Sequence, residues 1–170
     1  MRSLLTLLTL LLISFSITAQ TNTGISKTDT LAPYQKNATI PSFSIQMPDS
    51  SWFSKVNLKD KKPTLILYFS PDCGHCQLET EEIITKMKDL SNLQIVMITS
   101  RPFRDMVNFA DRYKLNRFPS IKIGTDPSRM VTQFYAVKFT PFSAVYDKKG
   151  QFVKAYEKGI DMAELITLAK

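Results

Sequence analysis

The sequence contains only two cysteines, and they stand three residues apart in the segment Cys73-Gly74-His75-Cys76. This segment follows an apolar run at residues 64–69 and opens a stretch with helical periodicity. Two cysteines in the first turn of a helix can form a disulfide with each other and release it again. A disulfide that closes so short a loop constrains the unfolded chain only weakly. The pair therefore indicates reversible redox chemistry rather than structural cross-linking.

The two cysteines are expected to have different roles. Cys73 stands at the helix start, where unpaired backbone N–H groups and the positive end of the helix dipole favour a thiolate. Its pKa is therefore expected below the free value of about 8.5, which makes it the attacking nucleophile. Cys76, one turn further, is expected to be the less exposed, resolving thiol. The expected cycle is attack by Cys73 on a partner disulfide, a mixed disulfide, and release by Cys76.

Two neighbouring residues are expected to tune the reduction potential in opposite directions. His75 adds a donor that stabilises the thiolate, which favours the dithiol form and makes the disulfide more oxidising. Asp72 places a negative charge beside the nucleophile and acts the other way. The residue types do not decide between these effects, so a reductant and an oxidant or isomerase are both open.

The composition argues against other uses of the cysteines. His75 is the only histidine. A c-type haem site requires Cys-x-x-Cys-His, and Gln77 follows the second cysteine here. A structural zinc site needs about four ligands, so we expect no metal and no cofactor. The net charge of +7 is scattered along the chain and forms no basic stripe interleaved with aromatics, so no nucleic-acid partner is expected.

The N-terminus has the pattern of an export signal. Arg2 precedes an apolar run at residues 4–17 and small residues that end at Ala19, which is typical of a secretory signal peptide. The run is shorter than the roughly 20 residues of a membrane-spanning helix. We expect residues 1–19 to be a cleaved signal peptide, with an uncleaved anchor as the alternative, and the protein to be periplasmic or otherwise extracytoplasmic.

The rest of the chain divides into a spacer and one folded domain. Residues 20–42 are polar, Thr-rich and without apolar periodicity, which predicts a flexible linker. Residues 43–170 are expected to fold. Strand patterns occupy residues 43–45, 65–69, 93–98, 142–146 and 151–156, helix patterns occupy residues 73–90, 106–113 and 161–169, and residues 118–127 carry short strand-like pieces. This order predicts an α/β sandwich with a mixed sheet.

Several segments around the two cysteines carry a family resemblance. Residues 56–63 precede the first core strand, residues 68–76 contain the CxxC, residues 118–119 and 134–137 form an insertion, and residues 139–150 contain a proline loop and a hairpin. In this order they resemble the thioredoxin superfamily and, within it, the TlpA/ResA-like extracytoplasmic thiol–disulfide oxidoreductases. The resemblance covers about residues 43–170. It implies a thioredoxin fold, with a central mixed β-sheet flanked by helices and a TlpA/ResA-like insertion.

The resemblance also implies roles for further residues. Pro141 matches the family's cis-proline, which lies beside the CxxC and lines the groove for the partner chain; Pro119 is the alternative position. Thr140 would offer backbone groups to an extended substrate segment. Glu79 matches an acidic residue near the family's active site and is expected to relay a proton to or from Cys76. The alternative for Glu79 is an ordinary glutamate on the helix surface.

Two positions depart from the family pattern. Asp72 stands where the family usually has Trp, and Leu67 stands where ordinary thioredoxins carry a buried acid. The predicted function is nevertheless that of an exported thiol–disulfide oxidoreductase with protein thiols or disulfides as substrates and a membrane partner as an electron donor. A thioredoxin-fold binding module without catalytic activity is the alternative.

Overall fold

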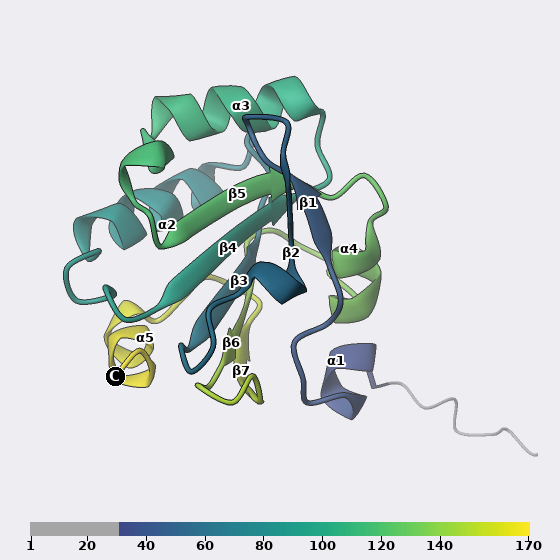
Figure 1. Cartoon of the computed structure of the whole chain (residues 1–170), viewed down its shortest axis with the longest axis vertical. Helices are drawn as coiled ribbons and strands as arrows, with labels where there is room; N and C mark the ends of the chain where they lie inside the picture. Colours follow the sequence, from purple (N-terminus) through teal and green to yellow (C-terminus); the bar gives the residue numbers. More distant parts are fainter. Residues whose placement is uncertain (1–30) are drawn as a thin grey trace, which may run out of the picture. The chain divides into compact units, whose positions relative to one another are not determined.

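Residues 31–170 are described by the computed structural model (Figure 1). The expected signal peptide, residues 1–19, and residues 20–30 of the expected linker lie outside the described residues. Leu31–Lys170 form one compact unit. Over this range, no helix has both the length and the apolar character that crossing a membrane requires.

A seven-stranded mixed sheet runs through the domain in the order β2-β1-β5-β4-β3-β6-β7. β3, β4 and β5 are parallel to one another, and the other neighbouring strands pair antiparallel. The mixed sheet predicted from the sequence is therefore confirmed. The strands are β1 (Ser44–Gln46), β2 (Trp52–Ser54), β3 (Thr64–Tyr68), β4 (Gln94–Thr99), β5 (Ile121–Thr125), β6 (Phe142–Tyr146) and β7 (Phe152–Tyr156).

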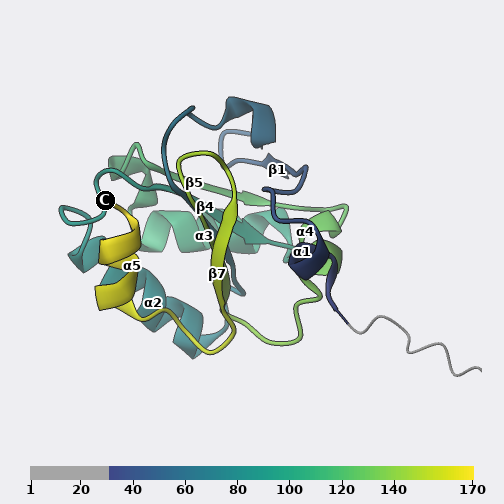
Figure 2. The same ribbon diagram turned by 90° about the horizontal axis from the view of Figure 1, so that it is seen from below.

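Helices cover both faces of this sheet (Figures 1 and 2). α2, α3 and α5 contribute side chains to the hydrophobic core on one face, and α1 and α4 contribute to the core on the other. Figure 2 shows α1 and α4 next to each other, on the opposite side of the domain from α5. The helices are α1 (Pro33–Lys36), α2 (Gly74–Thr85), α3 (Phe103–Arg112), α4 (Met130–Tyr135) and α5 (Met162–Leu168), with short 3₁₀ helices at Lys55–Asn57 and Leu115–Arg117.

β3 lies inside the sheet, between β4 and β6, and contributes to both cores. Leu65 and Leu67 belong to the core under α2, α3 and α5, whereas Ile66 belongs to the core under α1 and α4. Each of the three is at most 1 % exposed. A strand that is buried on both faces needs no polar alternation, which explains the continuous apolar run in the sequence.

The crossover from β3 through α2 to β4 positions the two cysteines. Residues 69–73 connect the end of β3 to the start of α2, and β4 returns parallel to β3. Cys73 therefore lies at the carboxyl end of β3. α2 ends at Thr85, earlier than the expected end at residue 90, and turns lead the chain to the fully buried Leu90.

β1 and β2 form a hairpin that extends the sheet beyond β5. Gly124 allows the close approach of β1, because a Cβ there would lie 2.7 Å from the carbonyl oxygen of Gln46. Neither β2 nor α4 is predicted by the sequence pattern. With three and six residues, these elements are too short to display a period.

The structure differs from the expected linker over residues 31–42. This segment contains α1, and both Tyr34 and Ile40 are buried at 6 % exposure. The backbone also pairs with the start of β7, since Thr39 bridges Gln151 and the N–H of Phe152 donates to the carbonyl of Ala38. Tyr34 and Ile40 are too far apart in the sequence to give an apolar periodicity. The polar composition of residues 31–42 therefore predicts a linker, although the segment belongs to the folded domain.

Candidate active site

The CxxC forms the junction between β3 and α2, as the sequence predicts. Cys73 is the N-cap residue of α2, and its Sγ accepts a hydrogen bond from the backbone N–H of Cys76 at 3.3 Å. The turn before it is closed by the Cys73 N–H, which donates to the carbonyl of Ser70 at 3.1 Å. Both cysteines are free thiols.

The environment of Cys73 favours its thiolate. Partial burial alone would raise the pKa of this thiol, but hydrogen bonds outweigh that effect and the pKa is lowered overall. The donors are the Cys76 thiol, the Thr140 side chain and the backbone N–H groups of Cys76 and His75. When protonated, the Cys73 thiol donates to the carbonyl oxygen of Thr140 at 3.4 Å. Cys73 therefore has the features of an attacking nucleophile.

Cys76 has the opposite character. It is 1 % exposed and belongs to the core under α2, α3 and α5. Burial and, to a smaller extent, the hydrogen bond to Cys73 raise its pKa to about 12. A thiol with this pKa remains protonated at neutral pH, so Cys76 needs a proton acceptor before it can react.

Thr140 and Pro141 lie directly beside the cysteines. The Thr140–Pro141 peptide bond is cis, which is the isomer that the resemblance implies, and Pro141 is buried. These residues reach the site because β6 pairs antiparallel with β3, so that Phe142 at the start of β6 lies opposite Tyr68 at the end of β3. The antiparallel register therefore brings the proline loop and the CxxC to the same edge of the sheet.

Glu79 lies on the inner side of α2 and is 6 % exposed. Its carboxylate accepts hydrogen bonds from the hydroxyl of Ser143 at 3.3 Å and from the backbone N–H of Ile160 at 3.0 Å. Burial outweighs these donors and raises the pKa of Glu79. The interpretation of Glu79 as a residue on the helix surface does not agree with this burial. Within residues 31–170, Glu79 forms no hydrogen bond with either cysteine.

The carboxylate of Asp72 interacts with two neighbouring side chains. Its carboxylate accepts a hydrogen bond from the hydroxyl of Ser70 and forms an ion pair with Arg101 at 3.1 Å. The Ser70 hydrogen bond is the main reason that the pKa of Asp72 is lowered, and Arg101 contributes to a smaller extent. The side chain of Arg101 is 50 % exposed and that of Asp72 is 66 % exposed. Asp72 is therefore a charge that a neighbouring cation partly offsets.

Arg101 is a site residue that sequence reasoning misses. It follows β4 and lies 29 positions from Asp72 in the chain, so no local pattern connects them. A cavity of about 350 Å³ lies beside this ion pair and is also lined by Gln77, Asp105 and Arg112. Gln77 closes its edge by donating to the carbonyl of Pro71 at 2.9 Å.

His75 and two apolar side chains are exposed near the CxxC. The backbone N–H of His75 faces the Cys73 thiol, while its side chain is exposed. Leu78 on α2 is 64 % exposed and Phe139, which precedes Thr140, is 78 % exposed. In the part of the chain from residue 31 onward, no three His, Cys, Asp or Glu residues are grouped so that they could hold a metal ion.

Comparisons with solved structures agree with this architecture. A thioredoxin described from Neisseria meningitidis has 25 % identity and a TM-score of 0.62, with 75 % of this chain and 84 % of that chain covered. A secreted disulfide oxidoreductase of Mycobacterium tuberculosis, homologous to E. coli DsbE, has 21 % identity and a TM-score of 0.60, covering 75 % and 93 %. A thiol peroxidase from Chromobacterium violaceum has 16 % identity and a TM-score of 0.63, covering 76 % and 82 %. These similarities confirm the thioredoxin fold.

Comparison with sequences gives the family. No curated protein sequence matches the chain significantly. A sequence model of the Redoxin family matches residues 35–167, which is most of the chain and includes both cysteines. Together with the structural neighbours, this match supports a thiol-based redox enzyme of the oxidoreductase or peroxidase type. The chain belongs to the Redoxin family, within the thioredoxin superfamily.

Proposed function

We propose that this protein is an exported thiol–disulfide oxidoreductase that exchanges dithiol and disulfide with protein partners. The observation that carries the proposal is the asymmetry of the two thiols. Cys73 is half-buried with a lowered pKa, whereas Cys76 is buried with a pKa raised to about 12. A two-step exchange requires one thiol that is ionised and attacks first. It also requires a second thiol that stays protonated until it resolves the mixed disulfide.

In the reducing direction, the Cys73 thiolate attacks one sulfur of a partner disulfide. The partner S–S bond breaks, the leaving sulfur takes up a proton, and Cys73 is joined to the partner by a mixed disulfide. Cys76 then loses its proton and attacks the Cys73 sulfur, which releases the second partner thiol. Two electrons pass to the partner, and Cys73 and Cys76 are left as a disulfide. Oxidation of a partner dithiol is the reverse sequence.

In this proposal Glu79 accepts the proton of Cys76 before the second step. Support comes from its position one helical turn after Cys76, its burial and its raised pKa, which bring a carboxylate closer to a useful proton affinity. The hydrogen bonds from Ser143 and the Ile160 N–H hold the Glu79 carboxylate on the inner side of α2, the side on which Cys76 is buried.

Thr140 and Pro141 are proposed to bind an extended segment of the protein substrate. Support comes from the contact between the Thr140 carbonyl and the Cys73 thiol, and from the exposed apolar side chains of Leu78 and Phe139. Exposed apolar side chains around a reactive group favour association with apolar protein segments. Unfolded or extended chains with a disulfide therefore fit this site.

The direction of electron flow is proposed to depend on a small balance of charges. Arg101 offsets the negative charge of Asp72, which reduces the penalty that Asp72 places on a Cys73 thiolate. A reduction potential near about −270 mV would assign a reductant, and one near about −180 mV an oxidant or isomerase.

Export is proposed from the pattern of residues 1–19 and is supported by what is described for proteins of similar structure. The Mycobacterium tuberculosis relative is described as secreted, and a thioredoxin of Streptococcus pneumoniae with 19 % identity and a TM-score of 0.55 is described as an exposed lipoprotein. An extracytoplasmic reductant has no cytosolic source of electrons, so a membrane protein is the proposed electron donor.

The test is a pair of cysteine variants in an insulin-reduction assay. We expect Cys73→Ser and Cys76→Ser each to abolish turnover, and Cys76→Ser alone to accumulate mixed disulfides with protein substrates that mass spectrometry identifies. Unchanged turnover in both variants would exclude the enzyme in favour of a binding module. Faster consumption of hydrogen peroxide than of insulin disulfides would assign a peroxidase instead.

A further inference from the structure

A second cavity lies at the opposite end of the sheet from the cysteines. It has a volume of about 410 Å³, which is within the range of about 300–1,000 Å³ that is typical of small-molecule sites. Gln94 lines the cavity and pairs with Thr64 at the first residue of β3, whereas the CxxC follows the last residue of this strand. The cavity is therefore separate from the proposed redox site.

The floor of this cavity is apolar. Phe53 from β2 and Leu93 next to β4 are buried, and both line the cavity. Leu58, Met87 and Phe118 are half-buried side chains that line it from three other segments. These residues belong to the edges of both hydrophobic cores. A ligand with an aliphatic or aromatic body would gain free energy by covering this surface.

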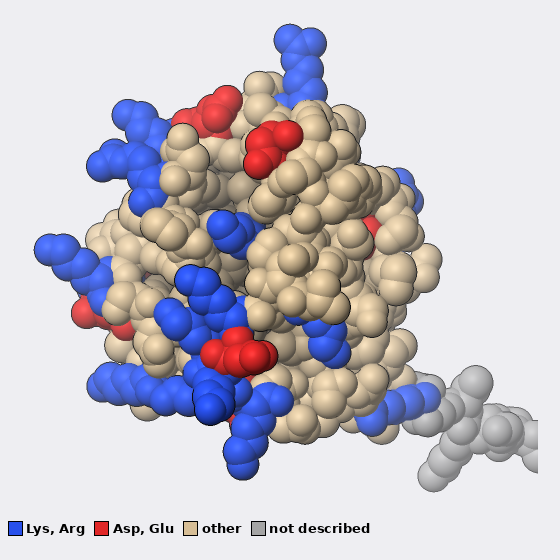
Figure 3. All heavy atoms as spheres, viewed as in Figure 1, with Lys and Arg blue, Asp and Glu red and all other residues tan. Residues whose placement is uncertain are grey.

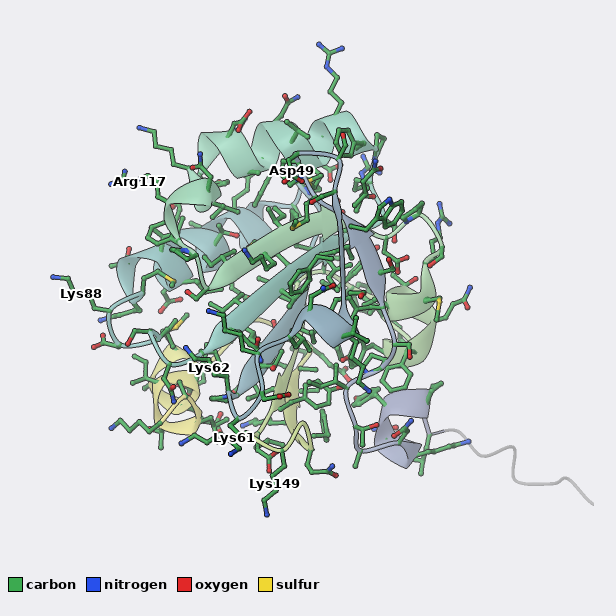
Figure 4. The ribbon with its side chains drawn as sticks, viewed as in Figure 1. Asp49, Lys61, Lys62, Lys88, Arg117 and Lys149 are labelled. Carbon is green, nitrogen blue, oxygen red and sulfur yellow. The ribbon has the colours of Figure 1, made fainter. Side chains whose placement is uncertain are left out.

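The rim of the cavity is cationic. Four lysines line it, and no acidic residue does: Lys59, Lys62, Lys88 and Lys122. The ion pairs within residues 31–170 are Arg101–Asp72 and Lys154–Glu164, so none of these four lysines is engaged in one. Figure 3 shows Lys and Arg atoms gathered over the lower left of this face, with some acidic atoms among them, and Figure 4 shows Lys62 and Lys88 on that side.

The acidic residues nearest in sequence lie outside the cavity. Asp60 and Asp89 are exposed and do not line the cavity. Asp49 interacts with Lys122, although its lowered pKa results mainly from the hydroxyl of Ser51. Three lysines remain for a ligand even when Lys122 is shared with Asp49.

The loop that carries two of these lysines is held in place by a buried amide. The Gln94 side chain is 9 % exposed; its Nε2 donates to the carbonyls of Lys59 at 3.0 Å and Lys62 at 3.3 Å. Its Oε1 accepts from the N–H of Lys59 at 2.9 Å. The backbone between the two lysines is thus fixed to the start of β4. Because this backbone is already ordered, ligand binding costs only the conformational entropy of the lysine side chains.

From this combination we infer that the cavity binds an amphiphilic anion, with one acidic head group at the lysines and an aliphatic or aromatic body on the apolar floor. The apolar surface alone would accept any hydrophobic ligand, and the lysines alone any anion. Their placement around one cavity selects molecules that have both parts. Neighbouring ammonium groups also repel one another, and an anion between them relieves this repulsion.

Dodecanoate is a suitable probe, with isothermal titration calorimetry as the measurement on the purified protein. We expect one site per chain and binding that is about tenfold weaker in Lys59→Gln/Lys62→Gln. The charge-matched control is Lys138→Gln/Lys158→Gln, in which two exposed lysines outside the cavity are replaced. This control should bind dodecanoate as the parent protein does. Insulin reduction should be unchanged in both double variants, which separates this site from the proposed function.

Two further ligands and one mapping experiment complete the test. Dodecyltrimethylammonium, with the same tail and a positive head, and butanoate, with the same head and a short tail, should both bind at least about tenfold more weakly. Amide NMR shifts on dodecanoate addition should centre on Leu93 and Gln94. The inference is overturned if the cationic ligand binds equally well, if the shifts centre on the CxxC, or if only phosphatidylglycerol vesicles and not free dodecanoate are bound.

Discussion

The N-terminal part of α2 and the turn before it have an exposed outer side and a buried inner side. On the outer side, Cys73 is half-buried and Asp72 is exposed; the charge of Asp72 is offset by Arg101. On the inner side, Cys76 and Glu79 are nearly inaccessible to solvent. The pKa of the Cys73 thiol on the outer side is lowered, whereas the pKa of the Cys76 thiol on the inner side is raised to about 12.

In the proposed mechanism, this difference allows one helical turn to separate attack by Cys73 from resolution by Cys76. The backbone N–H groups of His75 and Cys76 at the helix start lower the pKa of Cys73, whereas at Cys76 burial outweighs the donors Ser70 and Thr140. Burial acts mostly on Cys76, since its side chain points into the core. The variants below test the two sides in order of decreasing expected effect.

Removal of the outer thiol should have the largest effect. Cys73→Ser should lower insulin reduction by about a thousandfold or more, because no other ionised thiol can attack the substrate disulfide. Steady-state kinetics are the measurement, with circular dichroism as the control for folding. Residual turnover above about a tenth of the parent rate would mean that Cys76 can attack directly, and the proposed division between the two sides would be lost.

Removal of the inner thiol should stop the reaction one step later. Cys76→Ser should still attack at a rate within about tenfold of the parent protein, but each molecule should stop as a mixed disulfide. Stopped-flow measurement of the first turnover, with mass spectrometry of the adduct, checks both parts. An adduct that resolves without added thiol would show that Cys76 is not the resolving residue.

Removal of the inner carboxylate should slow resolution without slowing attack. Glu79→Gln should lower the rate of the second step by about tenfold to a hundredfold, since its amide cannot accept the Cys76 proton. The first step should be unchanged. Glu81→Gln on the same helix replaces an exposed glutamate that does not act on the pKa of Glu79, and it is the matched control. Equal effects of the two variants would remove Glu79 from the mechanism.

Glu79 also has a predicted effect on stability that depends on pH. Its pKa is raised by burial, so the folded state holds this proton more tightly than the unfolded state does. The parent protein should therefore lose stability as the pH rises from the ordinary glutamate value of about 4.3 through the folded-state pKa. Glu79→Gln should remove this loss, which urea unfolding at several pH values measures. A stability difference between parent and variant that is the same at all pH values would contradict the raised pKa.

The ion pair on the outer side should have the smallest effect, because both partners are exposed. Arg101→Gln should leave Asp72 unopposed beside Cys73, which raises the thiol pKa and makes the disulfide less oxidising, by about twofold to fivefold in the equilibrium constant with glutathione. Asp72→Asn should shift the equilibrium the other way. Arg104→Gln replaces a nearby exposed arginine and should have no effect. An equal shift in Arg104→Gln would mean that Arg101 acts only through the net charge of the surface and not through its ion pair with Asp72.

The sequence predicts the central part of this site and not its surroundings. Cys73, Cys76 and the start of α2 follow from a local pattern, and Thr140 and Pro141 follow from the family resemblance. Glu79 also follows from the resemblance, but its hydrogen-bond partners do not, because they lie 64 and 81 positions away in the chain. Long-range contacts of this kind depend on the register of β6 against β3, which periodicity does not contain.

Long-range contacts also explain where the observed fold differs from the fold that the sequence predicts. β3 and β4 are predicted because each is a continuous apolar run, and α2 because its period changes after Cys73. Residues 31–42 look like a linker because their buried apolar residues, Tyr34 and Ile40, stand far apart among polar neighbours and pack against partners that are distant in sequence. The cationic rim of the second cavity is equally hidden, since its lysines come from separate loops and strands.

The central claim, that one helical turn gives the two thiols opposite character, is tested most directly by their alkylation rates. Reduced protein is treated with iodoacetamide from about pH 4 to about pH 10, and mass spectrometry follows each cysteine separately. We predict that Cys73 reacts with a midpoint below about 8.5, while Cys76, with a pKa of about 12, stays unmodified over this range. A common midpoint for both cysteines, or faster modification of Cys76, would contradict the account.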